Sequence, residues 1–426
     1  MIGRLAMALS DLTRAFARIG VLSFGGPAAQ IGLMSREFVQ KRGWLTEAEY
    51  LSALSFCMLL PGPEAMQLAT YIGWKRAGVL GGLIAGGLFV LPGAALILAL
   101  AMVYAAFGSV PLIAALFVGV QAAVLAIVIE ALLRLSKRAL TARGHLIIAA
   151  AAFAALFVFA LPFPVVILGA AAAGAILLRQ NTAQTGAPIG PAPWRASAAA
   201  ALIGGAAWLL PLAGTVAFAP QILGDIALFF SKLALLTFGG AYAVMAWMVD
   251  EVVQTNGWLT PAQMLDALAL AETTPGPLIL VTEFVAYIAA HAQGGVWMGV
   301  AGAAVALWMT FVPCFLWIFA GAPWMSRLQS APRLSAALAG IMAAVVGVIA
   351  HLSLWFALHV LFGRLATVSI GPAQVLLPDL STLRALPFAL ALLSGWLLLR
   401  RHWPLPAVLL VCAALSGVAA LINAAN

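Results

Sequence analysis

Glycine and proline motifs that interrupt very apolar segments are the features of this chain best suited to chemistry. Proline lacks an N–H and suits only the first turn of a helix, whereas glycine permits sharp turns. Helices broken at such motifs end with free N–H groups and a positive dipole end, which bind anions. The motifs occur twice, 214 residues apart, as Ser23-Phe24-Gly25-Gly26 with Pro61-Gly62-Pro63, and Thr237-Phe238-Gly239-Gly240 with Pro275-Gly276-Pro277.

Four such helix ends could meet near the middle of a membrane, at the interface between the two copies. Each end carries roughly +0.5 charge, so four sum to about +2, which matches a dianion. We therefore expect a tetrahedral oxyanion to bind at the four motifs. Nearby polar side chains that could add donors are Ser23, Gln67, Thr237 and Thr274. The alternative interpretation is that these glycines and prolines are packing kinks.

Three charged residues near the motifs are candidates for electrostatic or coupling roles. Arg18 and Lys232 occupy the same position in the two copies, six residues before the phenylalanine of each glycine turn. They either line the approaches to the anion site or extend to the membrane surface as helix-end cations. Glu64 follows Pro63 directly and either binds a coupling proton or stabilises its own helix N-terminus. Asp266 is interpreted as a loop or interface charge.

The composition predicts an all-α polytopic membrane protein. The chain is 65% hydrophobic and 8% charged, with a mean hydropathy of +1.10. Several apolar runs exceed the roughly 20 residues that span a bilayer. Three separated cysteines and five scattered histidines form neither a disulfide framework nor a metal pattern, so no cofactor is expected. The net charge of +8 is attributed to cytoplasmic loops rather than to nucleic-acid binding.

Loop charges predict that the two copies are inserted in opposite orientations. Cytoplasmic loops are enriched in Lys and Arg. The loop after the first glycine turn carries Arg36, Lys41 and Arg42, whereas the matching loop of the second copy carries Asp250 and Glu251. Two parallel copies should not differ in this way. The sequence thus predicts inverted-topology repeats with broken, re-entrant helices, and it leaves open that the hairpins are tilted full spans.

The predicted organisation has four parts and nine full spans. The parts are a first repeat at 1–179 with a cytoplasmic N-terminus, a cytoplasmic linker at 180–197, a connecting helix at 198–219 and a second repeat at 220–426. Each repeat opens with two re-entrant hairpins, which in the first copy are 19–35 and 46–74. Besides the connecting helix, the full spans are placed at 78–107, 109–133, 145–160, 163–178, 295–320, 334–358, 383–399 and 404–424. The C-terminus is then outside.

The motif-bearing segments resemble those of the chromate ion transporter family in its two-domain, fused form. The resemblance rests on Leu22–Pro27, Gly43–Thr46, Leu60–Gly73, Thr237–Gly240 and Thr274–Pro277. Family membership implies a multi-pass exporter of chromate in the bacterial inner membrane, which confers chromate resistance and for which sulfate is a structural mimic. It also implies homologous halves of opposite orientation. Ala286 stands where the family pattern suggests a glycine.

The expected function is potential-driven efflux of chromate by alternating access. The sequence does not separate chromate from sulfate, and an inward or proton-coupled oxyanion transporter remains the main alternative. An intramembrane enzyme would need a nucleophile–base pair or metal ligands at membrane depth, which the sequence does not show. A non-transporting scaffold would have no need of broken helices. The expected surroundings are the lipid bilayer, and a homodimer is left open.

Overall fold

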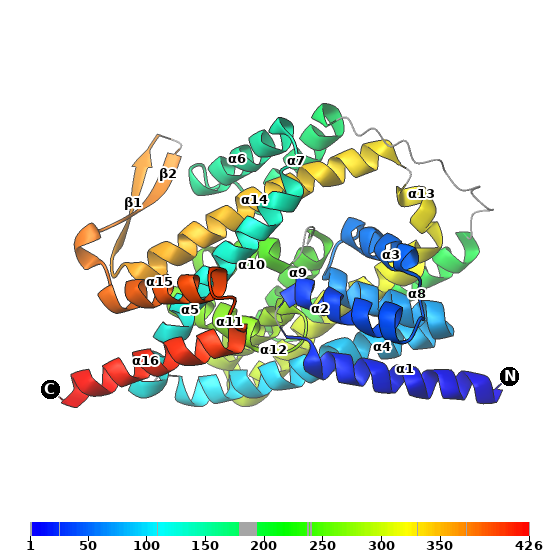
Figure 1. The fold of residues 1–426 in the computed structure, drawn as a ribbon, viewed down its shortest axis with the longest axis horizontal. Helices are drawn as coiled ribbons and strands as arrows, with labels where there is room; N and C mark the ends of the chain where they lie inside the picture. Colours follow the sequence, from blue (N-terminus) through cyan, green and yellow to red (C-terminus); the bar gives the residue numbers. More distant parts are fainter. Residues whose placement is uncertain are drawn as a thin grey trace. The chain divides into compact units, whose positions relative to one another are not determined.

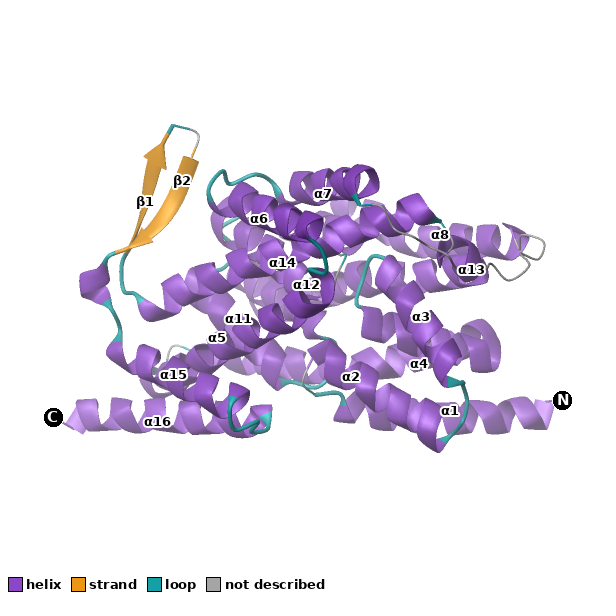
Figure 2. Ribbon diagram, turned by 45° about the horizontal axis from the view of Figure 1, so that its top comes forward, coloured by secondary structure: helices purple, strands orange, loops and turns teal. Residues whose placement is uncertain are grey.

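The computed structural model describes residues 2–24, 26–108, 110–178, 194–236, 238, 241–329, 331–371 and 373–425. Four motif residues, Gly25, Thr237, Gly239 and Gly240, lie outside these ranges, as does most of the predicted linker, 180–193. The described chain is largely helical, with a single β-hairpin (Figures 1 and 2). Six helices are long and apolar enough to cross a membrane, which confirms the helical membrane class.

The first copy contains seven α-helices and one π-helix. In chain order these elements are α1 (Ile2–Leu22), α2 (Gly26–Ser35), the π-helix η1 (Arg36–Lys41), α3 (Glu47–Leu59), α4 (Glu64–Phe107), α5 (Pro111–Ala139), α6 (Arg143–Phe157) and α7 (Phe163–Leu177). Helix α3 ends just before the first proline motif and α4 begins just after it, as predicted. The predicted span at 78–107 is the second part of α4, which is kinked at Ala77 and Gly78.

The rest of the described chain begins with α8 (Trp194–Phe218) and repeats the opening of the first copy. The repeated elements are α9 (Gln221–Leu236), α10 (Ala241–Val249), the π-helix η2 (Asp250–Thr255), α11 (Pro261–Thr273), η3 (Leu278–Leu280) and α12 (Val281–Gly321). The elements that follow are η4 (Ala322–Trp324), α13 (Met325–Gln329), α14 (Pro332–Leu361), β1 (Leu365–Ile370), β2 (Ala373–Pro378), η5 (Leu380–Thr382), α15 (Ala385–Leu399) and α16 (Leu405–Ala425).

Local turn chemistry is the same in both copies. Thr46 caps α3 by accepting from the Glu49 N–H at 3.3 Å, and Thr260 accepts from the Gln263 N–H at 3.2 Å. Both π-helices lie 214 residues apart, as do these caps. The kink in α4 has φ +65° at Gly78, and α12 has the same kink with φ +72° at Gly295. The sequence repeat is therefore a structural repeat.

Three structural features were not predicted. The arm before the first glycine turn is the end of α1, a single 21-residue helix that runs through Arg18. Helix α8 begins at Trp194, four residues before the connecting helix predicted at 198–219. The antiparallel hairpin of β1 and β2 (Figure 2) was not predicted, although β-branched residues are present at Thr367, Val368 and Val375.

Helices occupy the predicted spans, but their lengths differ. Long apolar helices are α4, α5, α8, α12 with its flanking turns, α14 and α16. Three more apolar helices, α6, α7 and α15, have 15 residues each. At about 1.5 Å per residue, such a helix covers only about 22 Å. Whether these three cross the membrane therefore remains a prediction.

The described chain forms two compact units. The first comprises 1–102, 180–244 and 274–335, and the second comprises 103–179, 245–273 and 336–426. Within each unit, glycines let helices approach closely, as is common in membrane bundles. In the first unit, Gly302 packs against Ala286 within α12. The glycine at this contact is therefore Gly302, after the kink, and not the residue at position 286, where the family pattern suggests one. In the second unit, a Cβ at Gly119 of α5 would overlap the Cys412 carbonyl oxygen of α16.

Candidate functional site

The glycine turn of the first copy meets the proline turn of the second copy in the first unit. The Gly276 N–H donates to the Ser23 carbonyl oxygen at 2.9 Å. Gln30 of α2 joins the same pair, since its Nε2 donates to the Gly276 carbonyl at 2.6 Å and to the Ser23 carbonyl at 3.3 Å. The Gln30 side chain is buried, and its Oε1 has no hydrogen-bond partner among the residues that the structure describes. Two motifs separated by about 250 residues are thus held in direct contact.

Helix α4 supports this junction from the other side. A Cβ at Gly93 would overlap the Pro275 carbonyl oxygen and would lie 3.1 Å from the Gly276 Cα. Gly276 itself has φ +97°, a conformation that other residues rarely adopt. The proline turn therefore fits its position because two glycines, Gly93 and Gly276, remove side chains where the backbones cross.

The proline turn of the first copy is held by side chains instead. Gly62 has φ +121°, and a Cβ there would lie 2.7 Å from the Gln67 Nε2 and 2.8 Å from the Cys314 Sγ. Gln67 donates from Nε2 to the Pro61 carbonyl at 2.6 Å. Its side chain is fully buried, and its Oε1 has no partner. Gln67 was predicted as a donor to the anion, and in this conformation its Nε2 holds the proline turn instead.

The second glycine turn is described only at Phe238. The Phe238 N–H donates to the Leu236 carbonyl at 3.0 Å, and Phe24 makes the same bond to Leu22 at 3.0 Å. Thus both helices that enter a glycine turn end in the same way. The Phe24 side chain is exposed at the turn of the first copy.

Two donors that the sequence assigned to the anion are occupied in this conformation. The Ser23 hydroxyl donates to the Ile19 carbonyl one turn earlier, at 2.6 Å. The Gly276 N–H is taken by the Ser23 carbonyl, so the tip itself does not present a free N–H. Helices start after Pro63 and after Pro277, and their first N–H groups have no acceptor within the helix, so these groups are the candidate donors. Thr274 beside the second proline turn is buried.

The charged candidates lie at the edge of this arrangement. The side chains of Arg18 and Lys232 are exposed on α1 and α9, as expected for cations that extend to a membrane surface. Glu64 is half-buried at the first position of α4. The pairing of the turns therefore involves backbone groups and glutamine side chains rather than charges.

Sequence reasoning missed two residues of the junction and underrated two buried carboxyl groups. Gln30 and Gly93 were not singled out, although a lone uncharged polar residue within an apolar hairpin was a usable signal for Gln30. Glu283 on α12, a weaker candidate because it follows the second proline motif, is 1% exposed, and its Oε2 has no hydrogen-bond partner among the described residues. Asp266 was interpreted as a loop charge, but it is buried in the second unit and accepts from Tyr104 Oη and Gln121 Nε2, both at 2.6 Å.

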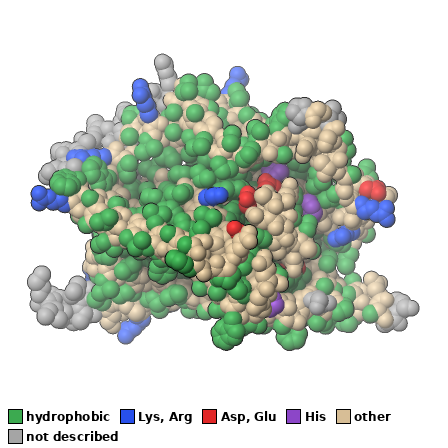
Figure 3. Space-filling view, turned by 180° about the vertical axis from the view of Figure 1, so that it is seen from behind, with side chains coloured by type: hydrophobic (Ala, Val, Ile, Leu, Met, Phe, Trp, Pro, Cys, Tyr) green, Lys and Arg blue, Asp and Glu red, His purple; other side chains and the backbone are tan. Residues whose placement is uncertain are grey.

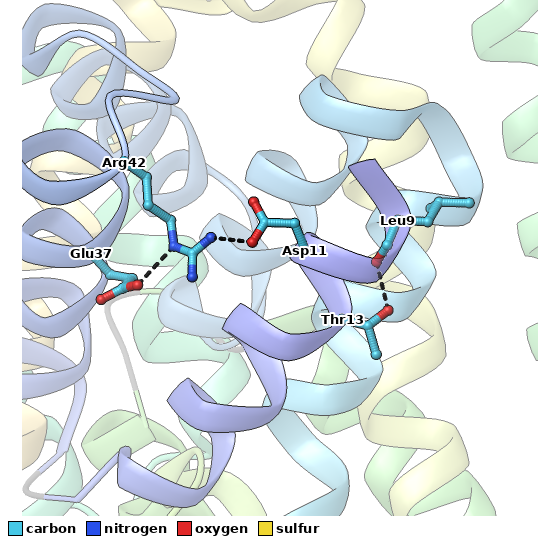
Figure 4. Close-up of polar contacts among 5 residues, drawn as sticks. All are labelled: Leu9, Asp11, Thr13, Glu37 and Arg42. Carbon is cyan, nitrogen blue, oxygen red and sulfur yellow. Dashed lines mark hydrogen bonds and ion pairs between the residues drawn. The ribbon is translucent and has the colours of Figure 1, made fainter. Parts of the chain in front are cut away.

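The basic loop of the first copy is closed by an ion-pair clamp (Figure 4). Arg42 donates from Nε to Glu37 at 2.7 Å and from an Nη to Asp11 of α1 at 2.6 Å. The hydrogen bond from Arg42 lowers the pKa of Glu37 from its ordinary value of 4.5, despite the partial burial of this carboxylate. The Arg42 guanidinium also lies over the Trp44 ring, 5.2 Å from its centroid. The clamp fixes η1 against α1.

Comparison with known proteins identifies the repeat. A family model described as chromate transporter matches residues 10–175 and again residues 224–418. The probable chromate transport protein of Synechococcus elongatus is 33% identical over 97% of this chain and 96% of its own. Chromate transport proteins of Cupriavidus metallidurans and Pseudomonas aeruginosa are 32% and 33% identical over 80% and 86% of this chain, and over 80% and 85% of their own. No solved structure matches significantly.

Proposed function

Because the chain belongs to the chromate transporter family, we propose that it exports chromate across the bacterial inner membrane by alternating access. The observation that carries the proposal is the hydrogen-bonded junction of Ser23 and Gly276, where interrupted helices of the two copies meet in one compact unit. Broken helices that meet at a repeat interface are the usual substrate site of transporters built from repeats. We infer that the dianion binds beside this junction.

In this proposal the ligands of the anion are backbone N–H groups at the starts of helices. Helices begin after Pro63 and after Pro277, and the first N–H groups of a helix have no acceptor within that helix. Gln30 and Gln67 hold the turns in place through their Nε2 groups. The glycines of the motifs have no side chain, so neighbouring groups lie close to the backbone of the turns. Residues of the second glycine turn would complete the site from the opposite copy.

We further propose that the repeats, 1–179 and 220–426, are inserted with opposite orientations and that α8 is the single connecting span between them. The reversal of charge in the otherwise identical π-turn loops supports this topology, because basic loops stay in the cytoplasm. In the second unit, the loops that this topology places outside also lie together. Gln374 of the β-hairpin donates to the Val158 carbonyl between α6 and α7, at 2.7 Å.

The membrane potential is sufficient to drive this efflux. Moving one charge through 100 mV is worth about 2.3 kcal/mol, so a dianion gains about 4.6 kcal/mol on leaving a negative cytoplasm. At about 1.4 kcal/mol per decade, this energy supports a gradient of roughly a thousandfold. Export therefore needs no coupling ion. If Glu64 bound a coupling proton, Glu64→Gln would flatten the pH dependence of flux.

The decisive experiment measures flux in proteoliposomes with a defined potential. Purified protein is reconstituted, and a potassium gradient with valinomycin sets the sign of the voltage. We expect chromate to move toward the positive side and to reverse direction when the potential is reversed. Sulfate in excess should compete, because it has the same shape and charge. Chromate flux that ignores the voltage would contradict the electrogenic mechanism, and no flux of either ion would contradict the function.

The inverted topology is tested separately by labelling cysteines. The three native cysteines are buried, so they give little background. Lys41→Cys and Thr255→Cys place thiols at the same exposed position of the two π-turn loops. In intact cells, a membrane-impermeant maleimide should label the cysteine at position 255 and not that at position 41. Labelling of both positions from the same side would rule out inversion.

A further inference from the structure

The second unit contains a pocket of about 490 Å³ that the transport mechanism does not use. Its walls come from η2, the loop between α6 and α7, helix α14 and the β-hairpin. On the face drawn in Figure 3, acidic and histidine side chains gather in one region. The volume falls within the range of pockets that bind small organic molecules, about 300 to 1,000 Å³. π-Helices such as η2 also occur frequently at functional sites.

The pocket carries negative charge without a basic partner. Asp250 and Glu251 line it, and its described lining contains neither Lys nor Arg. In the first copy, the loop carboxylate Glu37 is neutralised by Arg42, but Asn256 stands at the position of this arginine in the second copy. Among the described residues, Asp250 forms an ion-pair contact with His351, whose Nε2 lies 3.9 Å from Asp250 Oδ1. A dianion such as chromate would be repelled from this pocket.

The other walls are aromatic and include an imidazole nitrogen that has no hydrogen-bond partner among the described residues. Phe163 and Trp247 stack with their ring centroids 5.3 Å apart, and Trp355 lies 4.1 Å from the His359 ring. Aromatic faces attract cations and pack against flat apolar groups. His351 is 9% exposed, lines the pocket and has no hydrogen-bond partner at Nδ1. In a neutral imidazole, this nitrogen is free to accept a hydrogen bond from a ligand.

We propose that this pocket binds an organic cation in which a guanidinium or ammonium group is attached to a flat apolar body. The charged group pairs with Asp250 and Glu251, and the body packs between the aromatic side chains. A bare metal ion is a poorer occupant, because hard divalent cations require about six to eight closely spaced oxygen ligands. The walls of this pocket are mostly apolar or aromatic. The inference is independent of the transported anion.

Calorimetric titration of the full-length protein in detergent tests the proposal with two probes of the same shape. Phenylguanidine carries the charge, and phenylurea is its neutral analogue. We expect phenylguanidine to bind and phenylurea to bind at least tenfold more weakly. Replacing both carboxylates, in Asp250→Asn/Glu251→Gln, should weaken the binding of phenylguanidine roughly tenfold or more, since hydrogen bonds between charged groups are stronger than those between neutral ones.

Two further variants keep the test decisive. Glu130→Gln removes a carboxylate of α5 that does not line the pocket, so it should leave binding unchanged. Gln254→Lys places an ammonium group at an exposed position of the pocket wall, where folding is not threatened, and should abolish phenylguanidine binding. Equal binding of phenylurea, full binding by Gln254→Lys, or displacement of phenylguanidine by equimolar magnesium chloride would overturn the proposal.

Discussion

The π-turn loops of the two copies have the same shape but opposite charge. Arg42 N–H donates to the Glu37 carbonyl at 3.1 Å, and Asn256 N–H donates to the Glu251 carbonyl at 2.9 Å. The next bond is also repeated, since Trp44 and Trp258 each donate to a carbonyl at 2.8 Å. The backbone path is therefore set by hydrogen bonds and the caps at Thr46 and Thr260. Side-chain charge can vary along this path without changing the backbone, so it can differ with the orientation of each copy in the membrane.

The proline turns differ in what holds them. The first turn is contacted by the side chains of Gln67 and Cys314, whereas the second is crossed by the backbone of α4 at Gly93. Side chains can move by rotation about single bonds, but a helix backbone cannot. The same motif is therefore expected to tolerate change in the first copy better than in the second. The following variants test this asymmetry and the asymmetry of the loops.

The largest effect is expected from Gly276→Ala. The new methyl group would meet Leu280 Cδ1 at 2.9 Å and Gly93 Cα at 3.2 Å, at a φ of +97°. Left-handed strain costs about 1–2 kcal/mol, and overpacking adds about 1–3 kcal/mol. The unfolding temperature and the anion flux should both fall sharply. Gly62→Ala should lose less stability, because the side chains it meets can shift.

The control for both substitutions is Gly87→Ala in α4. No atom lies within 4 Å of a Cβ at this helical position. Its stability should equal that of the wild type or exceed it slightly, since alanine favours helices. If Gly62→Ala proved as damaging as Gly276→Ala, the crossing of α4 would add nothing to the backbone strain that both turns share.

The next effect is expected when Arg42 is replaced by the residue of the second copy. Arg42→Asn leaves Glu37, which is 9% exposed, without its hydrogen bond from Arg42 and should cost about 1–3 kcal/mol at neutral pH. The pKa of Glu37 is lowered in the folded state, so the clamp stabilises the protein above pH 4.5 and loses this effect as the pH falls through the lowered value. The difference in melting temperature between wild type and variant should therefore shrink in acid.

A double variant distinguishes this mechanism from general damage to the loop. Adding Glu37→Gln to Arg42→Asn removes the carboxylate that has lost its Arg42 partner, so part of the lost stability should return. The double variant should also lack the acid dependence. An acid profile of Arg42→Asn that runs parallel to the wild type would show that the ion pair does not stabilise η1.

A smaller effect is expected at Gln30, where the second copy has Val244. Gln30→Val removes the bonds from Nε2 to the Ser23 and Gly276 carbonyls. The Gly276 N–H would still reach Ser23, so only part of the junction is lost, and we expect a cost of about 1–2 kcal/mol. Flux should fall more than stability does, because the relative position of the turns changes. Unchanged flux in a destabilised variant would remove Gln30 from the site.

These residues also show what the sequence predicts and where it fails. Local chemistry is legible, because Thr46 and Thr260 cap their helices and Pro63 and Pro277 precede the starts of new helical segments, as the motifs indicate. Contacts between distant segments cannot be predicted in this way. No residue near Ser23 indicates that Gly276 is its partner, and Gly93 is important only because another backbone crosses it. The β-hairpin was missed because its two strands of six residues lie within a loop between apolar spans.

The smallest effect is expected at Glu283, a carboxylate that the first copy replaces by Ala69. Its Oε2 has no partner, and among the described residues no Lys, Arg or His nitrogen forms an ion pair with it. An ionised carboxylate in such a place would be costly, so the group is expected to carry a proton. Glu283→Gln keeps the shape of the protonated acid, and its unfolding temperature should equal the wild type or rise slightly. Infrared difference spectra of the two proteins should show one protonated carboxyl band that the variant lacks. If the band is absent from the wild type, or if the variant is strongly destabilised, then Glu283 is ionised and holds a cation, and the second copy differs from the first in charge at its core as well as in its loops.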